Sequence, residues 1–437
     1  MITTHLRRIL HMLCLAAAIV SIGACGGEDD DGDARIRVIN ATADADSIDL
    51  TIDNDDVDER RLVEAIARDG QSDYTGIDAD AFTLRVKRAG ASSTLAVAST
   101  GFGKDEHHTV FAYGREGDYR IYAAVDDEGE PSGGKAKVRV FNAAFDAGAV
   151  DVYLTEADAE LDNTIATAAN VAGSTMRSYS TIDRGTYRLR VTGANDKDDL
   201  RLDVAGIDAA DGSRLTIVLQ PGTGGVLVHA LLSQYQGGLA SAKNTFARAR
   251  LVSGVNSNAA VTARLGSSSL NVNLRSPSVG GYALVPAGNQ EASVQVNAGS
   301  ALTGSVQLAA GGDYTLAVHG DPASPVWRLI TDDNRLPAGA DQARLRLLHM
   351  AEGVGANLTL VKDYLGVAND VAYGNVSSYA LVAASTASAT TRVEVTSPLS
   401  VTPLFLEDEV ELPARSVFTV FMLGGATTPT GILRRER

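Results

Sequence analysis

The residues of this sequence best suited to acid–base or metal chemistry are its histidines. Downstream of residue 25 they are His107, His108, His229, His319 and His349. None has the spacing of a zinc-binding helix such as H-E-x-x-H. His107 and His108 are adjacent in a predicted strand, so their side chains point to opposite faces and do not bind one ion together. We therefore expect structural roles for the histidines and no metal site.

Nucleophilic and phosphate-binding motifs are the next possibility. The sequence contains no G-x-S-x-G elbow and no obvious set of Ser, His and acid within one repeat. The stretch STGFGKDE, which begins at Ser99, differs from a phosphate-binding loop at two positions. Ala98 stands where the first glycine belongs, and Asp105 stands where Ser or Thr is needed. We predict a turn between two strands there, no catalytic or cofactor-binding residues, and a protein that is not an enzyme.

Acidic clusters remain as candidate sites. They are DNDDVDE at Asp53, DDEGE at Asp126, DKDD at Asp196 and TDDN at Thr331. Carboxylates that converge between domains would suit Ca²⁺, although no cluster matches the D-x-D-x-D-G loop. The alternative is that these acids keep loops and sheet edges solvated. Glycoside hydrolysis by paired carboxylates is disfavoured, because aromatic residues, at 5%, are scarce for a sugar-binding cleft.

The cysteine at position 25 is the remaining reactive group. Residues 1–24 have a basic start with Arg7 and Arg8, an apolar segment of about a dozen residues and small residues at the end, which is the pattern of a secretory signal. The apolar segment is shorter than the roughly 20 residues of a membrane-spanning helix. Cys14 would leave with the signal, so the mature chain would hold one cysteine and no internal disulfide.

The stretch from Ile22 to Cys25, IGAC, resembles the bacterial lipobox. The resemblance implies that the sulfur of Cys25 is diacylated and that Cys25 becomes the N-terminus. Each buried CH₂ of an acyl chain contributes about 0.8 kcal/mol, so two or three chains anchor a protein firmly. An ordinary signal that leaves Cys25 as a free thiol is the alternative. Residues 25–33 continue as CGGEDDDGD, which we interpret as a flexible acidic tether.

The location follows from the same stretch. Gly26, in place of Asp, resembles the pattern that releases lipoproteins of Gram-negative bacteria from the inner membrane. We therefore expect an envelope protein at the outer membrane, facing the periplasm or the cell surface. Its partners would be the membrane, through the acyl chains on Cys25, and envelope proteins or glycans. The net charge of −16 argues against binding to nucleic acid.

Two sequence anchors repeat four times. The second basic residues of four similar strands are Arg37, Arg139, Arg250 and Arg346, and four later tyrosines are Tyr74, Tyr179, Tyr282 and Tyr379. Both sets recur at intervals of about one hundred residues, which indicates tandem repeats. The predicted organisation is a signal (1–24), a tether (25–33) and four repeats (34–130, 131–239, 240–340 and 341–437).

Alternating apolar and polar residues within each repeat predict short strands with frequent turns. In the second repeat, Tyr187, Leu189 and Val191 lie on one face and Arg188 and Arg190 on the other. This pattern is typical of an antiparallel β-sandwich. The opening K/R-x-R strand is expected to place its basic side chains on the outer face.

One helix is also expected. It would span residues 58–68, where Leu62, Val63 and Ile66 would share a face and Gly70 would follow the end.

The repeat unit resembles the DUF4397 family. The second repeat carries the resemblance best, through RVFNA, DAGAVDVYL and GTYRLRV, while the third and fourth diverge. The resemblance implies tandem immunoglobulin-like β-sandwiches in a bacterial envelope protein and implies no activity. The expected function is that of a non-enzymatic, lipid-anchored structural, adhesion or protein-binding module. The alternative is a ligand-binding lipoprotein, for example for glycans, with a groove or domain junction near Trp327 and Tyr314.

Overall fold

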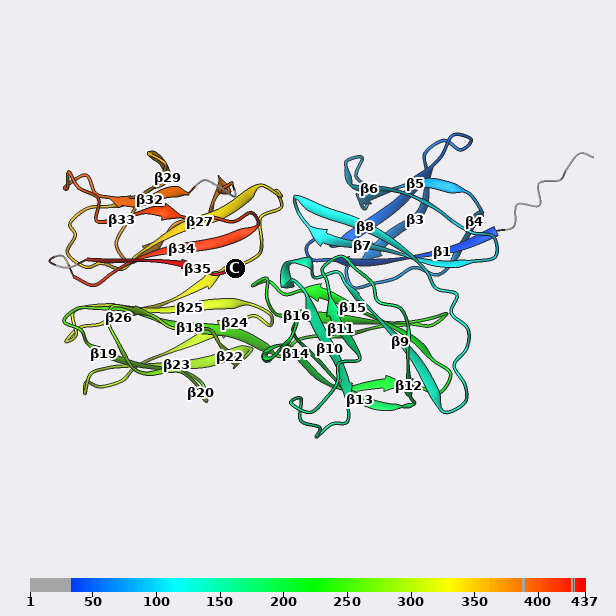
Figure 1. Ribbon diagram of the computed structural model, residues 1–437, viewed down its shortest axis with the longest axis horizontal. Coiled ribbons are helices and arrows are strands. Elements are labelled where there is room, and N and C mark those ends of the chain that lie inside the picture. The colour runs from blue at the N-terminus through cyan, green and yellow to red at the C-terminus, as the bar shows by residue number, and fades with distance from the viewer. Residues whose placement is uncertain (1–32, 387–389, 426, 428) are drawn as a thin grey trace, which may run out of the picture.

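The computed structural model describes residues 33–386, 390–425, 427 and 429–437. Its regular structure consists of β-strands and one short 3-10 helix, and the strands form eight sheets. The sheets pack in twos as four sandwich-like units, named units 1 to 4 in chain order (Figure 1). The expectation of an all-β chain of sandwiches is therefore confirmed.

The strands of unit 1 are β1 Asp33–Thr42, β2 Ser47–Asp53, β3 Arg60–Ala67, β4 Thr75–Asp78, β5 Ala81–Arg88, β6 Thr94–Gly101, β7 His107–Arg115 and β8 Asp118–Val125. Those of unit 2 are β9 Lys135–Asn142, β10 Val150–Thr155, β11 Ala168–Val171, β12 Ser180–Asp183, β13 Gly185–Gly193, β14 Asp196–Ala209, β15 Arg214–Pro221, β16 Val228–Gln234 and β17 Leu239–Ala242, with the 3-10 helix η1 at Phe145–Ala147.

The strands of unit 3 are β18 Phe246–Val255, β19 Ala260–Leu265, β20 Ser268–Arg275, β21 Ser278–Val279, β22 Ala283–Pro286, β23 Gly288–Val296, β24 Leu302–Leu308, β25 Asp313–Gly320 and β26 Val326–Asp332. Those of unit 4 are β27 Gln342–His349, β28 Leu358–Lys362, β29 Leu365–Val371, β30 Asn375–Val376, β31 Ala380–Ala383, β32 Thr391–Thr396, β33 Phe405–Val410, β34 Ser416–Leu423 and β35 Thr430–Arg435.

All four units share one strand order. In unit 1 the sheets are β4-β1-β7-β8 and β3-β2-β5-β6, and the other units repeat this arrangement. The opening strand of each unit pairs in parallel with a late strand, as β1 does with β7. The expectation of a purely antiparallel sandwich is therefore wrong for one sheet of each unit. A parallel pair needs a long crossover, and here the intervening strands supply it, five in units 1 and 2 and six in units 3 and 4. The order also differs from the ABED and CFG sheets of an immunoglobulin constant domain.

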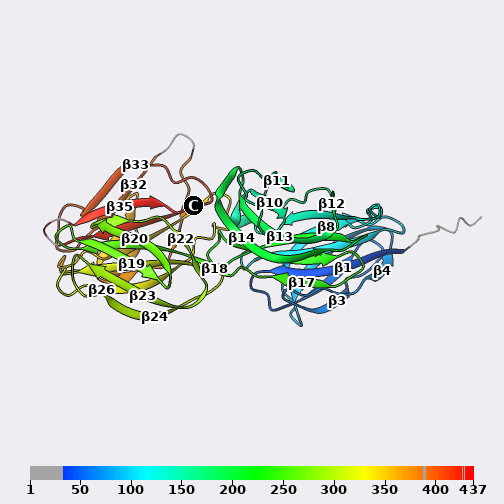
Figure 2. The ribbon, with the colours of Figure 1, turned by 90° about the horizontal axis from the view of Figure 1, so that it is seen from below.

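The opening strand is buried on both faces. In β1, Val38 belongs to the core of unit 1, whereas the next residue, Ile39, packs with Phe111 and Phe141 between units 1 and 2. A second such cluster, which contains Val252, lies between units 3 and 4. The units thus form two pairs, which lie side by side in Figures 1 and 2.

The predicted helix at residues 58–68 is wrong, because strand β3 occupies this segment. A β-bulge interrupts its pairing with β2, and Ala65 there adopts a left-handed φ of 53°. A bulge inserts one extra residue and shifts the alternation of faces. Val63 and Ile66 therefore both pack toward the core of unit 1 at a spacing that imitates a helix.

Candidate functional site

The two repeated sequence anchors meet inside every unit. Each second arginine of the opening strand places its guanidinium carbon over the ring of the repeated tyrosine of the same unit. The distances to the ring centroid are 4.9 Å for Arg37–Tyr74, 4.6 Å for Arg139–Tyr179, 4.5 Å for Arg250–Tyr282 and 4.5 Å for Arg346–Tyr379. Such cation–π contacts are favourable by about 0.5–2 kcal/mol, and the largest values occur where water is excluded.

A threonine on the neighbouring parallel strand accepts a hydrogen bond from each of these arginines. The arginine Nε donates to the threonine Oγ1 over 2.8 Å for Arg37–Thr109, 2.9 Å for Arg139–Thr216, 2.9 Å for Arg250–Thr315 and 3.1 Å for Arg346–Thr419. The four arginines are at most 6% exposed. The expectation that the basic side chains of this strand face outward is therefore wrong for the second arginine, because the other unit of the pair covers it, whereas Arg35 is exposed as expected.

One aspartate lies between the two arginines of each pair. In units 3 and 4 this residue is Asp332, which accepts from Arg346 Nη2 over 2.5 Å. Asp332 also accepts from the hydroxyls of Tyr282 (2.8 Å) and Thr315 (2.6 Å). Burial opposes the charge of Asp332, but Arg346 and Arg250 outweigh it and lower the pKa of the carboxyl.

Asp126 has the same role between units 1 and 2. It accepts from Arg139 Nη2 over 2.5 Å and from the hydroxyl of Tyr74 over 2.7 Å, and it lies 3.6 Å from Arg37 Nη2. Both aspartates are 1% exposed. In the sequence both lie in acidic clusters for which we weighed Ca²⁺ binding against solvation of loops and sheet edges, and this role was missed. A usable signal was present, because each precedes the second arginine of the following unit by 13 or 14 residues.

The two pairs of units differ in the remaining hydrogen-bond partner of the arginine that belongs to the first unit of the pair. Arg250 binds Glu436 with two hydrogen bonds of 2.7 Å, whereas Arg37 donates to the backbone carbonyl of Gln234 over 2.8 Å. Glu436 is carried by the last segment of unit 4 and therefore ties units 3 and 4 together. The arginines and the central aspartates of the clusters are buried and bind one unit to its neighbour, while the tyrosines are partly exposed and Arg139 and Tyr179 border a hollow of about 420 Å³. Their geometry suits cohesion between units and leaves no arginine free for a ligand.

The aspartate of the family motif V-D-V-Y is a second buried carboxylate. Asp151 accepts from the backbone N–H of Asn170 (2.7 Å) and of Asn195 (2.9 Å). Asp49 holds the N–H groups of Ala65 (2.8 Å) and Gly90 (3.1 Å) in unit 1. Each aspartate therefore fixes an edge-strand bulge and a hairpin turn.

Units 3 and 4 lack this aspartate. In unit 3 its place is taken by Thr262, whose hydroxyl accepts from the N–H of Asn273 over 3.0 Å. Unit 3 thus keeps a side-chain hydrogen bond to the bulge through a shorter residue.

The first two histidines are separated as expected. His107 contacts Asp127 at 3.2 Å, and His108 lies 3.2 Å from Glu106. His229 Nδ1 accepts from the N–H of Asn244 over 3.0 Å, and burial with the charge of Lys243 lowers its pKa to about 4.

His319 and His349 lie beside one another, which the sequence did not indicate. Both flank Tyr373, with ring centroids 5.0 Å and 5.9 Å away. Within residues 33–386, 390–425, 427 and 429–437, no three His, Cys, Asp or Glu side chains converge as they would to hold a metal ion.

The proposed aromatic platform has a structural role in unit 3. Tyr314 is 6% exposed, and its hydroxyl accepts from the N–H of Ala309 over 2.8 Å. Trp327 packs against the core of unit 3 and covers Gly304, where an added Cβ would lie 2.7 Å from the indole. The segment after Ser99 forms the connection from β6 to β7, as predicted.

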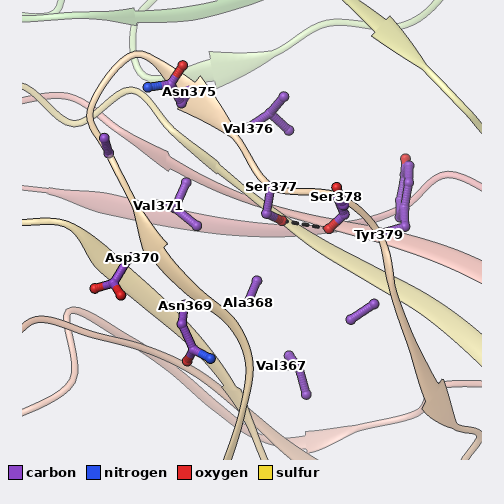
Figure 3. A pocket seen from close by; sticks show the side chains of 12 residues that line it. Val367, Ala368, Asn369, Asp370, Val371, Asn375, Val376, Ser377, Ser378 and Tyr379 are labelled. Atoms are coloured by element: carbon purple, nitrogen blue, oxygen red, sulfur yellow. Dashed lines mark hydrogen bonds between the residues drawn. The ribbon is translucent and has the colours of Figure 1, made fainter.

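Two hollows in unit 4 are the open features nearest to a binding site. The larger, of about 450 Å³, lies between strand β29 and residues 375–380 (Figure 3). Figure 3 shows Val367, Ala368 and Val371 facing the segment that carries Ser377 and Ser378. Ser377 Oγ is already committed, since it donates to the carbonyl of Ser378 over 2.8 Å. The second hollow, of about 330 Å³, is lined by His349 and Tyr373.

Cys25, the residue predicted to carry the lipid, lies outside the described residues, as do the signal and nearly all of the tether. In the part of the chain that the structure describes, no helix is long and apolar enough to cross a membrane.

Comparisons with known proteins identify one family. The matching family model is described as "Domain of unknown function (DUF4397)", and it matches residues 34–153 and 247–359. Each match covers the first unit of a pair, the first strand of the second unit and the start of its second strand. Each match therefore includes the central aspartate and the arginines on both sides of it. A search of curated proteins finds no match.

Two solved structures show distant similarity. The TIE protein of Bacillus anthracis is 9% identical over 65% of this chain and 50% of its own, with a TM-score of 0.15. This chain thus spans about half the length of that protein. The family CBM26 module of Amy13K from Eubacterium rectale, solved with maltoheptaose, is 13% identical over 47% of this chain and 97% of its own, with a TM-score of 0.16. At these scores neither match carries an argument about function.

Proposed function

The chain belongs to the DUF4397 family, and from this premise we propose that it is a non-enzymatic protein of the bacterial cell envelope, anchored through lipid on Cys25. Its role is structural, adhesive or protein-binding. The anchor places it at the outer membrane, facing the periplasm or the cell surface. The proposal rests on IGAC at residues 22–25 for the anchor and on the paired units for the role.

The structural role is supported by what the repeated polar residues contact. Side chains that could bind substrate, such as Arg250, Asp332 and Arg346, are at most 2% exposed and bind one another across the boundary between units. A buried charge that loses its partner is costly, so these groups favour a cohesive scaffold over an open site. Cohesion between units is what a spacer or adhesion module requires.

The domain identities are part of the same proposal. We take the four units as domains with bounds 34–130, 131–239, 240–340 and 341–437, and we take units 2 and 4 as further copies of the family. The common strand order and the common Arg, Tyr and Thr set support this. An immunoglobulin-like relationship would hold at the level of two packed sheets, since the strand orders differ.

Fractionation of cells tests the anchor. The native chain is expected in the membrane fraction, and Cys25→Ser is expected in the soluble fraction, because the acyl chains supply the membrane affinity. Cys14→Ser is the matched control and should fractionate as the native chain does, because Cys14 would leave with the signal. Membrane retention of Cys25→Ser would contradict the proposal. Digestion of intact cells with protease would then distinguish the cell surface from the periplasm.

A ligand-binding role is the second candidate. Trp327 and Tyr314 do not favour it, since both pack into unit 3. The hollow of about 330 Å³ beside His349 does favour it, because apolar side chains and the 39% exposed ring of Tyr373 line this hollow.

A further inference from the structure

Strand β8 of unit 1 has one free edge. It is the last strand of the sheet β4-β1-β7-β8, and among the described residues no strand pairs with its other side. The N–H of Asp126 donates to the carbonyl of His107, so every second residue of β8, counted back from Asp126, directs its backbone groups toward β7. Ile121 and Ala123 therefore point their N–H and C=O groups away from the sheet. Such an edge is a template for a further strand.

A hollow of about 420 Å³ lies along this edge, and we call it the β8 hollow. Residues 122–125 of β8 form one wall, and residues 176–179 of unit 2 form the other. Tyr122 and Met176 pack at the margin of the apolar cluster around Phe141, so the hollow continues the boundary between units 1 and 2. Its volume lies within the range of ligand-binding pockets, which is roughly 300–1,000 Å³.

The equivalent edge of unit 2 belongs to β16. Arg139 of unit 2 donates over 2.8 Å to the carbonyl of Val125, the last residue of β8. Arg37 of unit 1 donates over 2.8 Å to the carbonyl of Gln234, the last residue of β16. The two units thus face each other with equivalent contacts, in which Val125 corresponds to Gln234.

In unit 2 a segment of the chain itself occupies this place. Strand β17, with the sequence Leu-Ala-Ser-Ala, pairs antiparallel with β16 and sets Ala240 opposite Leu232, the residue that corresponds to Ala123. Leu239 packs against the cluster around Phe141. On the corresponding stretch of β8 the described residues provide no such strand, and the β8 hollow lies there instead.

Arginines bridge the equivalent edges of units 3 and 4. Arg328 of β26 donates to a backbone carbonyl of unit 4 over 3.0 Å, and Arg434 of β35 donates to one of unit 3 over 2.9 Å. Counted from the repeated threonine, these arginines take the places of Tyr122 and Ala124 in β8. Neither of those two residues has a charged side chain that could reach across to unit 2.

Unit 1 has a bridge at only one end of this stretch. Arg120 of β8 donates to Ser174 Oγ of unit 2 over 3.0 Å. Residues 122–125 lie beyond this bridge, and Val125 among them is 47% exposed. The place that β17 occupies beside β16 is therefore bounded beside β8 but not filled.

We propose that the edge of β8 binds an extended segment of another protein, which adds to the sheet as a strand within the β8 hollow. Strand addition takes its affinity from backbone hydrogen bonds and its specificity from pockets for alternate side chains. The segment would place small side chains along β8 and one side chain of the size of leucine against Tyr122 and Met176, as β17 does with Leu239 beside β16. The proposal rests on the protein-binding role proposed above and deepens it, and it does not depend on the anchor at Cys25.

Nuclear magnetic resonance of the full chain with Cys25→Ser and methyl-labelled methionine tests the site. The probe is a capped peptide with the sequence of residues 238–242, Gly-Leu-Ala-Ser-Ala. It should shift the methyl signal of Met176 in a saturable way and leave unchanged the signals of the methionines of unit 4, which are fully buried. The same peptide with Ala240→Pro is the control and should not shift Met176, since proline has no N–H to donate to the edge.

Two variants of the protein locate the bound peptide. Ala123→Pro removes an N–H that faces the free edge and keeps the hydrogen bonds to β7, so it should weaken binding about tenfold or more, since one lost hydrogen bond is worth about 1.4 kcal/mol. Ser178→Trp, at an exposed position, narrows the hollow from the opposite wall and should also weaken binding. Ala123→Ser keeps the N–H and is the matched control, which should bind as the parent does. Thermal unfolding curves close to that of the parent show that the variants are folded.

Unchanged affinity in both Ala123→Pro and Ser178→Trp, or no response of Met176 to the peptide, would overturn the proposal. Association of the chain with itself that Ala123→Pro abolishes, measured as a molecular mass that rises with concentration, would also overturn it, because the occupant would then be a second copy. A failure at this edge leaves the cohesion of the units and the anchor standing. The fractionation of Cys25→Ser tests the anchor separately.

Discussion

At the scale of single residues, the organising feature is a carboxylate placed between two arginines. Asp332 joins Arg346, Tyr282 and Thr315, and Arg250 is held in turn by Glu436. Every charge in this cluster is buried, so each depends on the others for compensation. The repeated arginines thus take part in the contacts between units.

Neutralising Asp332 tests this dependence. Asp332→Asn keeps the shape of the side chain but leaves Arg346 and Arg250 with less compensation, so the free energy of unfolding should fall by about 3–5 kcal/mol. Urea unfolding followed by near-ultraviolet circular dichroism measures the loss. Asp408→Asn is the control, because its ion pair with Arg392 is 58% exposed on the carboxylate side and should matter by less than about 1 kcal/mol. Equal effects of the two substitutions would refute the role of the cluster.

A histidine makes stability depend on pH. Burial with the charges of Arg328 and His349 lowers the pKa of His319 to about 4, below its ordinary value of about 6.5. The folded state therefore binds fewer protons than the unfolded state between these values. The contribution of neutral His319 to the free energy of unfolding is fully present above pH 6.5 and is lost as the pH falls toward 4.

The size of this effect is on the order of 3 kcal/mol across that window. Urea unfolding at several pH values, with His319→Asn as the comparison, measures it. The slope of stability against pH should be smaller in the variant. Identical slopes in the two proteins would exclude the assignment to His319.

At the scale of elements, buried aspartates hold the irregular parts of the edge strands. Asp151 fixes a bulge at Asn170 and a turn at Asn195 with one carboxylate. The motif aspartate, whose role the sequence left open, is thus a constraint on local backbone shape.

Removing this constraint should cost stability. Asp151→Ala leaves two backbone N–H groups without their acceptor, so we expect a loss of about 1–3 kcal/mol in the free energy of unfolding. Asp196→Ala is a matched control. Asp196 also accepts from two backbone N–H groups, those of Asp198 and Asp199, but its turn is exposed to water. Chemical denaturation measures the free energy of unfolding of both variants. A similar small loss in the two would argue against the constraint that Asp151 places on the backbone.

The sequence predicted some of these elements and missed others for physical reasons. Alternation identified strands such as β13, in which Leu189 and Val191 belong to the core of unit 2. It failed at β3, where the bulge at Ala65 changes the spacing of the apolar residues to one that resembles a helix. Burial of Arg37 was also missed, because alternation gives the face of a side chain but not what covers that face.

At the scale of the whole molecule, the four units form two pairs that also contact each other. Arg437 Nη1 donates to the carbonyl of Gly225 over 3.0 Å, and the N–H of Leu336 donates to Asp146 over 3.2 Å. Four tandem repeats in the sequence are compatible with either a rod of four units or two larger bodies. The clusters around Ile39 and Val252 lie between units and produce the paired arrangement.

Small-angle scattering of the chain with Cys25→Ser tests this arrangement in solution. A compact body of this length has a radius of gyration of roughly 22 Å. The paired arrangement should exceed this value only moderately, and four units in a line would exceed it greatly. Phe141→Ala, which removes a fully buried ring between units 1 and 2, should raise the measured radius or lower the stability by about 3–5 kcal/mol. A rod-like profile of the native chain would contradict the pairing.

Mass spectrometry of the mature N-terminus tests most directly whether this chain is a lipid-anchored envelope protein. We expect residues 1–24 to be absent and the chain to begin at Cys25 with acyl chains on its sulfur. An N-terminus at another residue, or Cys25 with an unmodified thiol, would contradict it.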